Sequence, residues 1–463
     1  MRFGQADPRP DATSRSSGLL SRLLQGTLVM AFLRLVGVGL SFGLSAAMAH
    51  WLSVAEFGTY TYILSWIGML GMIGVYGLDR VMVRDVSVYY TQAAWNLLRG
   101  SLRWANGVAL LVSSALFGLV FMARALVGQS LEMYTSPMLT SPSLPVTRLW
   151  LIGGLCITMA ALAQVQQSTL RGLHRLASSQ LAEIVLQPAL TLLIVAVLLW
   201  VGTGTLTVVH ALVAYTLATG LALAFSGWLV YHALPSQVRA TPPLVHHRAW
   251  LVSASHMFLL TSLGAVNGRI DVLALGMLKG PEAVGIYSAA RRGSALIPLA
   301  LNMAVMAMAP TFASLYARGE QEALQHLVTR MSQLVLLGGV PVAAGMILFG
   351  RWFLLLFGPG FTGGQTALTL LSLGQLINIV AGPVASLLTM TGHERDVVMG
   401  IGLGAGANLV LSLALIPLWG INGAACAAAA SLILWNALLL RSVRQRLALS
   451  PTILGTIGLR LPR

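Results

Sequence analysis

Among the ionisable side chains inside apolar stretches long enough to cross a bilayer, four are the main candidates for function: Arg34, Arg269, Asp271 and Arg291. A charged side chain at the centre of a bilayer costs about 2.5–3.5 kcal/mol or more, so one that is present there is a candidate for function. The planar guanidinium group of arginine makes paired hydrogen bonds to phosphate oxygens. We therefore predict that Arg34, Arg269 and Arg291 are the cations of a cavity that binds an anionic substrate.

Each of these charges also has a simpler explanation. Arg34 lies only about seven residues into its apolar stretch, so its side chain could snorkel to the nearby membrane surface. Arg291 and the adjacent Arg292 could reach the opposite surface, and Arg292 is not among the predicted cavity cations. Arg269 could serve only to neutralise Asp271, although residues two apart on a helix face each other poorly. Asp271 is either a counter-ion or a protonatable site for H⁺ or Na⁺ coupling, and the sequence leaves both open.

Asp79 and Arg80 follow the second apolar stretch, at its predicted inner end. Side chains in this position could line the cytoplasmic entrance of a cavity, or could form an interfacial salt bridge with no role in binding. We list both residues as entrance candidates and keep the salt bridge as the alternative. Glu183 opens the fifth apolar stretch, and we interpret it as a charge at a helix start.

No pattern in the sequence indicates a metal site, a cofactor site or catalysis. Cys156 and Cys426 each lie in an apolar run without CxxC spacing, and His246 and His247 have no acidic or cysteine neighbour. The sequence contains no phosphate-binding loop and no recognisable Ser-His-Asp set. Basic residues are spread over short loops, so anionic membrane lipids are expected partners and nucleic acid is not.

The elements that position these side chains are membrane-spanning helices. Hydrophobic residues make up 57% of the 463-residue chain and charged residues only 9%, against about 25% charge in soluble domains. Apolar stretches of the length needed to cross a bilayer recur along the chain and predict an all-α integral membrane protein with about twelve spans. The predicted spans are 27–49, 59–78, 105–123, 149–168, 181–201, 206–231, 251–277, 287–310, 332–357, 365–390, 397–417 and 420–440. Prolines within several spans, among them Pro298, Pro341 and Pro383, predict bends.

Charge outside the spans predicts the orientation. Most of these arginines fall in segments on the same side as the N-terminus, including the arginine-rich ends of the chain. Cytoplasmic loops carry the excess of basic residues in membrane proteins. We therefore predict a multi-pass membrane protein with both termini in the cytoplasm.

The two halves of the chain repeat each other. Gly58 and Tyr60, between spans one and two, correspond to Gly285 and Tyr287, between spans seven and eight, at a constant separation of 227 residues. Because six spans is an even number, the two halves run in the same sense and form two six-helix bundles around a central cavity. The predicted regions are a tail 1–26, an N-lobe 27–231, a cytoplasmic linker 232–250, a C-lobe 251–440 and a basic tail 441–463.

Several segments carry a family resemblance. They are 52–60, the Arg269-Ile270-Asp271 triplet, the run 284–291 and the run 417–425. Together they resemble the polysaccharide-transporter (O-antigen, Wzx-like) flippases of the multidrug/oligosaccharidyl-lipid/polysaccharide exporter superfamily. The resemblance implies a V-shaped pair of bundles that moves an undecaprenyl-diphosphate-linked oligosaccharide to the outer leaflet for lipopolysaccharide O-antigen or exopolysaccharide synthesis. It also implies a polysaccharide polymerase and a chain-length regulator as partners.

Two other functions compete with this one. A cation-coupled multidrug exporter of the same superfamily would share the helices, but it would be expected to bind organic cations through acids, and arginines outnumber acids within these spans. A membrane enzyme of the polysaccharide pathway would need polar catalytic residues in a large outer loop. The longest predicted outer loop, 124–148, contains Glu132 as its only acid. We therefore expect a transporter rather than an enzyme.

Overall fold

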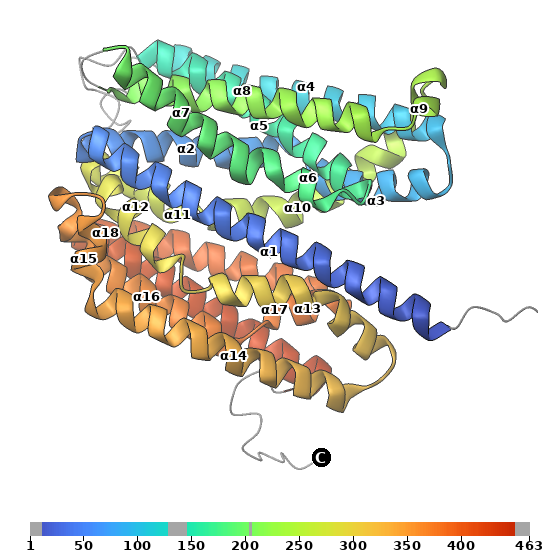
Figure 1. The fold of residues 1–463 in the computed structure, drawn as a ribbon. Coiled ribbons are helices and arrows are strands. Elements are labelled where there is room, and N and C mark those ends of the chain that lie inside the picture. Colours follow the sequence, from blue (N-terminus) through green and yellow to red (C-terminus); the bar gives the residue numbers. More distant parts are fainter. Residues whose placement is uncertain (1–11, 128–145, 203–205, 450–463) are drawn as a thin grey trace, which may run out of the picture.

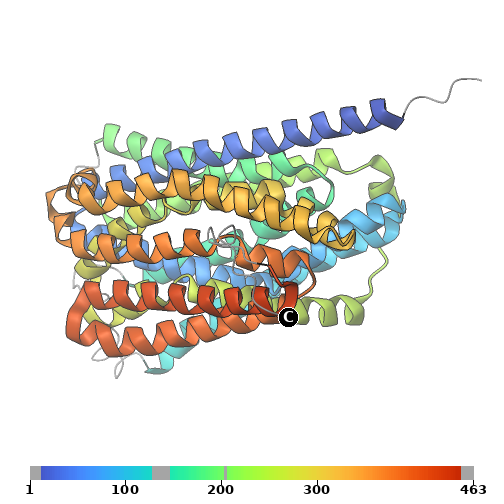
Figure 2. The same ribbon diagram turned by 90° about the horizontal axis from the view of Figure 1, so that it is seen from below.

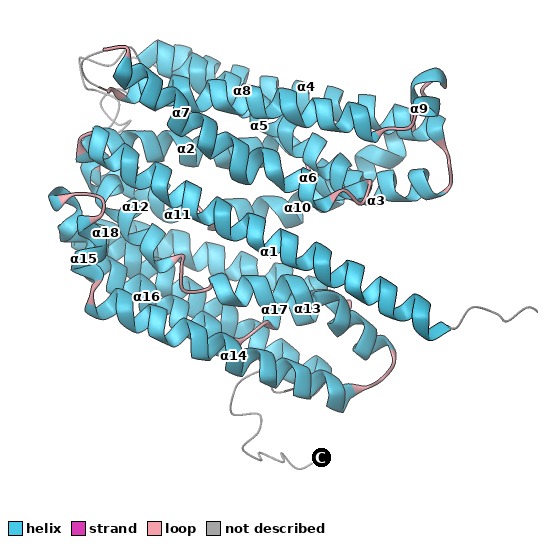
Figure 3. Cartoon of the chain, in the orientation of Figure 1, coloured by secondary structure: helices cyan, strands magenta, loops and turns pink. Residues whose placement is uncertain are grey.

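Helices are the regular elements of the described part of the chain, residues 12–127, 146–202 and 206–449 of a computed structural model (Figure 3). Ten helices in this part are long and apolar enough to cross a membrane. One of them, α18, contains two of the predicted spans, and the seventh predicted span is a broken helix outside the ten. The prediction of an all-α membrane protein with about twelve spans is therefore confirmed.

The first half of the chain forms the upper group of helices in Figure 1, except that its first helix, 12–51, runs diagonally between this group and the lower one. Their bounds are α1 (Ala12–Trp51), α2 (Val54–Val75), α3 (Leu78–Thr91), α4 (Trp95–Val127), α5 (Val146–Gly172), α6 (Leu176–Gln180), the π-helix η1 (Leu181–Leu186), α7 (Gln187–Trp200) and α8 (Val208–Ala233). α2 begins directly after α1 because Ser53 and Glu56 form a capping box, in which the Glu56 amide donates to Ser53 Oγ at 3.2 Å.

The second half, from residue 270 on, forms the yellow to red group below it, and Figure 2 shows the molecule from underneath. After α9 (Ser236–Ala240) in the linker come α10 (His247–Asn267), α11 (Ile270–Lys279), α12 (Pro281–Ser294), α13 (Leu299–Ala317), α14 (Gln321–Leu348), α15 (Gly350–Leu355), the 3₁₀ helix η2 (Pro359–Gly364), α16 (Gln365–Ala381), α17 (Val384–Met390) and α18 (Glu394–Leu447). α18 consists of two antiparallel arms that reverse at Gly420, where φ is +54°. The Ser431 hydroxyl on one arm donates to the Gly404 carbonyl on the other at 2.7 Å.

The helices differ from the predicted spans in three places. α1 begins at Ala12, so the predicted tail is helical from there on, while residues 1–11 and most of the predicted outer loop and basic tail lie outside the described residues. Of the predicted proline bends, Pro298 and Pro383 each stand at a helix break, whereas Pro341 remains inside α14. The seventh predicted span, 251–277, is present as two helices, α10 and α11.

That seventh span is broken between α10 and α11. Arg269 has a φ of −139°, outside the helical region, and is the residue that precedes α11. The break leaves backbone groups without helical partners, and broken membrane helices persist where other groups bind them. Here the Arg291 guanidinium donates to the Gly268 carbonyl. The Asn267-Gly268 pair at the break is a turn signal, whereas its binding partner, Arg291, lies on another helix.

The two lobes cross where α2 packs against α12. A Cβ atom added at Gly58 would lie 1.8 Å from the Pro281 carbonyl oxygen, and one at Gly285 would lie 2.4 Å from the Val54 carbonyl oxygen. These contacts are reciprocal, because Pro281 and Gly285 stand 227 residues after Val54 and Gly58. Gly58 thus touches the equivalent of Val54, and Val54 touches the equivalent of Gly58. Ser288 donates to Thr61 at 3.3 Å, and these two residues are also 227 apart. Such self-complementary contacts are the mark of a two-fold axis, here passing between the glycines.

A cluster of five phenylalanines, which we call the aromatic plug, joins the lobes near the end of α1. Six pairs of their rings have centroids 5.5–6.5 Å apart, and four of these pairs join one lobe to the other. The N-lobe contributes Phe42 and Phe57, and the C-lobe contributes Phe353, Phe357 and Phe361. Phe57, Phe357 and Phe361 are buried. The plug makes this end of the lobe interface apolar and closed.

Candidate functional site

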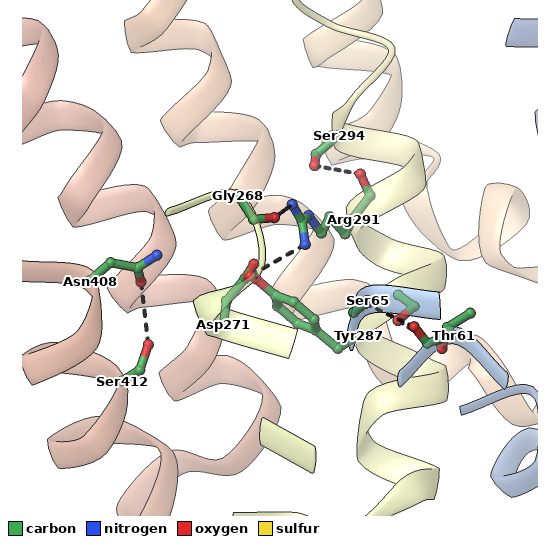
Figure 4. Close-up of polar contacts among 10 residues, drawn as sticks. Thr61, Ser65, Gly268, Asp271, Tyr287, Arg291, Ser294, Asn408 and Ser412 are labelled. Atoms are coloured by element: carbon green, nitrogen blue, oxygen red, sulfur yellow. Dashed lines mark hydrogen bonds and ion pairs between the residues drawn. The ribbon is translucent and has the colours of Figure 1, made fainter. Parts of the chain in front are cut away.

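Asp271 and Arg291 meet where α11 packs against α12 (Figure 4). The Asp271 carboxylate accepts a hydrogen bond from the Tyr287 hydroxyl at 2.6 Å and pairs with Arg291 Nη1 at 3.3 Å. Asp271 and Tyr287 are buried, at 4% and 0% exposure. Both carboxylate oxygens thus have partners inside the protein, and this is the geometry of a counter-ion. The arginine that pairs with Asp271 is therefore Arg291 and not Arg269.

Arg269 instead reaches across the lobe interface to α2. Its Nη1 atom lies 3.9 Å from the sulfur of Met72. A Cβ atom on Gly68 would lie 2.5 Å from Arg269 Nη2 and 2.9 Å from its Cζ, so the guanidinium occupies space that only a glycine leaves open. Among the ion pairs of the described residues none involves Arg269. Its charge is therefore available to a ligand.

Three arginines line one cavity between the lobes, which we call the arginine cavity. It has a volume of about 280 Å³ and is lined by Thr61, Leu64, Ser65, Arg269, Val272, Ser288, Arg291, Arg292 and Ala295. Within the described residues Asp271 is the only acid paired with any of these arginines. Three guanidinium groups and one carboxylate leave a net charge of +2. Arg292, which sequence reasoning left out, belongs to this set because it lines the same cavity as Arg269 and Arg291.

A second cavity lies inside the N-lobe and adjoins the first, since both are lined by Leu64 and Arg269. We call it the N-lobe cavity, and its volume is about 250 Å³. Its polar lining consists of Gln164, Gln167, Glu183, Gln187, Tyr215, Thr219, Ser226 and Arg269. Sequence reasoning missed this cavity and treated Glu183 as a charge at a helix start. The available signal was the group of glutamines within otherwise apolar stretches.

Glu183 is carried by the π-helix η1, between α6 and α7. π-helical turns occur frequently at functional sites, because the extra residue in the turn displaces side chains from their regular positions. α1 packs closely on this turn, since a Cβ atom at Gly37 would lie 1.7 Å from Ile184 Cγ2. Glu183 consequently lines the N-lobe cavity, opposite α2.

The lining of the arginine cavity does not include Arg34, Asp79 or Arg80. Arg34 is half-buried on α1 and lines neither of the two cavities. Asp79 and Arg80 begin α3, after a turn in which Tyr76 and Gly77 both have positive φ. They make no ion pair with each other in the described structure, and Asp79 Oδ1 is buried without a hydrogen-bond partner there. The binding role of Arg34 and the entrance role of the other two stay predictions.

The described residues contain no cluster of three or more His, Cys, Asp or Glu side chains placed to hold a metal ion. Cys156 and Cys426 are free cysteines. The charged groups that line the two cavities are guanidinium groups and a single carboxylate, Glu183.

Residues 23–316 match the family described as "Polysaccharide biosynthesis protein". The "Probable flippase AglR" of Haloferax volcanii is 26% identical over 188 residues, which covers 40% of this chain and 39% of AglR. The match therefore spans well under half the length of that relative.

Two solved structures share the fold. An inward-facing multidrug resistance MATE transporter of the MOP superfamily has a TM-score of 0.70 and 16% identity, with 90% of this chain and 98% of that chain covered. The lipid II flippase MurJ in an inward closed conformation has a TM-score of 0.68 and 13% identity, with 91% and 87% covered. The fold thus agrees with the resemblance seen in the sequence, and the family match covers more than half of the residues. This chain belongs to the polysaccharide biosynthesis protein family.

Proposed function

We propose that this chain is a flippase that moves an undecaprenyl-diphosphate-linked oligosaccharide from the cytoplasmic to the outer leaflet of the bacterial inner membrane. The observation that carries the proposal is the arginine cavity, which places a net charge of +2 between the lobes of a membrane protein. A diphosphate diester carries one negative charge on each phosphate, so the cavity matches its charge. The family description and the flippase relative support the same assignment.

The arrangement suits a ligand with a polar head and a lipid tail. Removing a phosphate from water costs several kcal/mol unless charged partners replace the water. Arg269 and Arg292 have no acidic partner among the described residues and would supply this replacement, while the tail stays in the bilayer. With the predicted topology, the aromatic plug closes the outer side of the cavity. Separation of the plug and closure of the inner side would then transfer the head group.

The membrane potential favours this direction of transport. An anion that leaves the negative interior gains about 2.3 kcal/mol per charge for each 100 mV. The alternative driving force is H⁺ or Na⁺ coupling through Asp271. The hydrogen bond from Tyr287 and the ion pair with Arg291 support the counter-ion role, because both stabilise an ionised carboxylate.

A multidrug exporter is the second candidate, since the MATE transporter shares the fold. The charge of the arginine cavity disfavours it, because a net positive site repels organic cations. We also propose that the chain is not an enzyme, that both termini are cytoplasmic, and that it works beside a polysaccharide polymerase and a chain-length regulator. The substrate would serve O-antigen or exopolysaccharide synthesis.

Depletion of the protein tests the function in cells. The expected result is accumulation of lipid-linked oligosaccharide in the inner leaflet of the cytoplasmic membrane, measured by its resistance to a membrane-impermeant glycosidase. Accumulation in the outer leaflet, or no accumulation, contradicts the proposal. A drug-efflux assay in a pump-deficient strain separates the second candidate, because export of organic cations by this chain would favour it.

Reconstituted vesicles test the site. Arg269→Gln and Arg292→Gln each remove a hydrogen bond to a charged group, which is worth about 1.5–3 kcal/mol. Transport of a polyprenyl-diphosphate oligosaccharide should therefore fall about tenfold to a hundredfold in each variant at limiting substrate. Arg395→Gln is the matched control, because Arg395 is exposed at the start of α18, far along the chain from the cavity. Equal transport by all three variants would remove the arginine cavity from the mechanism.

A further inference from the structure

The N-lobe cavity differs in chemistry from the arginine cavity beside it. Its lining holds one acid, Glu183, and a single cation, Arg269, which it shares with the arginine cavity. The remaining polar groups are the amides of Gln164, Gln167 and Gln187 and the hydroxyls of Tyr215, Thr219 and Ser226. Amides and hydroxyls both donate and accept hydrogen bonds. This lining suits an uncharged ligand that is rich in hydroxyl or amide groups.

One polar atom in the lining has no partner of its own. The Ser226 side chain is 1% exposed, and its Oγ atom makes no hydrogen bond to the described residues. A buried hydroxyl without a partner costs about 1–3 kcal/mol, so its presence in a cavity wall needs a reason. By contrast, Gln187 is fixed in place, because its Nε2 atom donates to Thr219 Oγ1 at 2.8 Å. The cavity therefore combines positioned donors with an unused hydroxyl.

The size of the cavity limits the ligand. A volume of about 250 Å³ corresponds to roughly eight liquid water molecules, at about 30 Å³ each. This is the order of size of one pyranose ring and is too small for an oligosaccharide. Arg269 lies at the junction of the two cavities. A diphosphate held by Arg269 in the arginine cavity would place its directly attached group at the N-lobe cavity.

We infer that the N-lobe cavity is the binding site for the first sugar ring of the substrate, and that it selects a neutral pyranose with hydroxyl or acetamido substituents. Gln164 and Gln187 would bond these substituents, and Ser226 would gain its missing partner. The Glu183 carboxylate would accept hydrogen bonds from hydroxyls and repel the carboxylate of an acidic sugar. This inference rests on the proposed function, because it needs the diphosphate in the arginine cavity.

Binding to the purified full-length protein tests the inference with three probes. They are a short-chain polyprenyl diphosphate, the same lipid with one N-acetylhexosamine, and the same lipid with one hexuronic acid. In the wild type, the N-acetylhexosamine should tighten binding at least tenfold over the bare diphosphate, whereas the hexuronic acid should give no gain. Gln164→Leu should remove the gain from the N-acetylhexosamine and leave the binding of bare diphosphate unchanged.

Two further variants keep a structural effect apart from a binding effect. Gln166→Leu is the matched control, since Gln166 lies on the same helix two residues from Gln164 but does not line the cavity. It should retain the tenfold gain. Glu183→Gln should keep the gain from the neutral sugar and newly bind the hexuronic acid probe, because the repelling charge is gone. A variant that only disturbed the fold would not change which sugar is preferred.

The outcomes distinguish failure of the proposed function from failure of the sugar site. If bare polyprenyl diphosphate does not bind the wild type, the proposed function fails and the sugar site fails with it. If the bare diphosphate binds but the sugar adds nothing, or if Gln164→Leu behaves like Gln166→Leu, the sugar site is refuted while the flippase proposal stands. An unchanged preference in Glu183→Gln refutes the role given to its carboxylate.

Discussion

Gly68→Ala is a test of Arg269 that leaves the arginine itself in the protein. Gly68 lies on α2, and the Arg269 guanidinium of the opposite lobe covers it. The new Cβ atom would lie 2.5 Å from Nη2 and 2.9 Å from Cζ of Arg269. Carbon atoms in contact prefer separations of about 3.5–4.0 Å. The guanidinium must therefore move by about 1 Å, away from its place at the junction of the two cavities.

The expected magnitude follows from this displacement. A hydrogen bond to a charged group is worth about 1.5–3 kcal/mol, so loss of its alignment should weaken diphosphate binding about tenfold to a hundredfold. Stability should not fall with it, because the clash is with the end of a flexible side chain. Alanine in a helix interior is even favoured over glycine by about 1 kcal/mol. We therefore expect Gly68→Ala to bind diphosphate more weakly and to have equal or higher thermal stability.

The assay is the binding of short-chain polyprenyl diphosphate to purified protein, together with thermal unfolding in the same detergent. Gly71→Ala is the matched control one turn along α2, where a Cβ atom would lie 3.6 Å from Ala160 Cβ, an ordinary contact. In an Arg269→Gln background, Gly68→Ala should have no further effect, since coupled residues are not additive. The reasoning is refuted if Gly68→Ala binds like Gly71→Ala, or if its effect persists without the arginine.

The remaining predictions concern the buried polar groups and the aromatic plug. Asp271→Asn leaves a partly buried arginine without its counter-ion and should lower the free energy of unfolding by about 3–5 kcal/mol. If the folded fraction of this variant still transports in vesicles with a membrane potential, ion coupling through Asp271 is excluded. Tyr287→Phe should destabilise the protein by about 1–3 kcal/mol because it removes a partner of the Asp271 carboxylate. Tyr60→Phe should be neutral or stabilising because the Tyr60 hydroxyl is buried with no partner among the described residues. Equal losses of stability in thermal unfolding would contradict this contrast. Phe357→Ala should open the aromatic plug, so that a Thr61→Cys variant lacking both native cysteines reacts faster with an impermeant thiol reagent from the outer side; an unchanged labelling rate would show that the plug does not close the cavity.

The sequence predicted the fold well because the fold depends on properties that are local. Long apolar stretches separated by arginine-rich loops require spanning helices, since backbone groups in lipid must bond within their own segment. The repeat was visible because the lobe crossing needs a glycine at both equivalent positions, Gly58 and Gly285, where two backbones approach. The bend at Pro298 was also predictable from the sequence, because proline lacks the amide hydrogen that a continuous helix needs.

The site was only partly predictable because it depends on which way each helix faces. Arg269 and Arg291 stood out as charges in apolar surroundings, and both line the arginine cavity. Arg34 has the same sequence signature, but α1 presents it to neither cavity. The Asn267-Gly268 pair is a turn signal within an apolar stretch, but the group that binds the Gly268 carbonyl is Arg291 on another helix. The N-lobe cavity was missed because glutamines carry no charge and so give a weak signal in an apolar run.

The two lobes share their helices but not their charges. Tyr60 and Tyr287 are equivalent in the repeat, yet only Tyr287 has an acid to bond, because Leu44 stands 227 residues before Asp271. The ion pair of Asp271 with Arg291 lies within the C-lobe and would move with it as a unit. Arg269 contacts the N-lobe at Gly68 and Met72, so these contacts must change whenever the lobes separate. Binding of a phosphate at Arg269 therefore depends on the relative position of the lobes. This dependence couples occupancy of the cavity to the movement that transport requires.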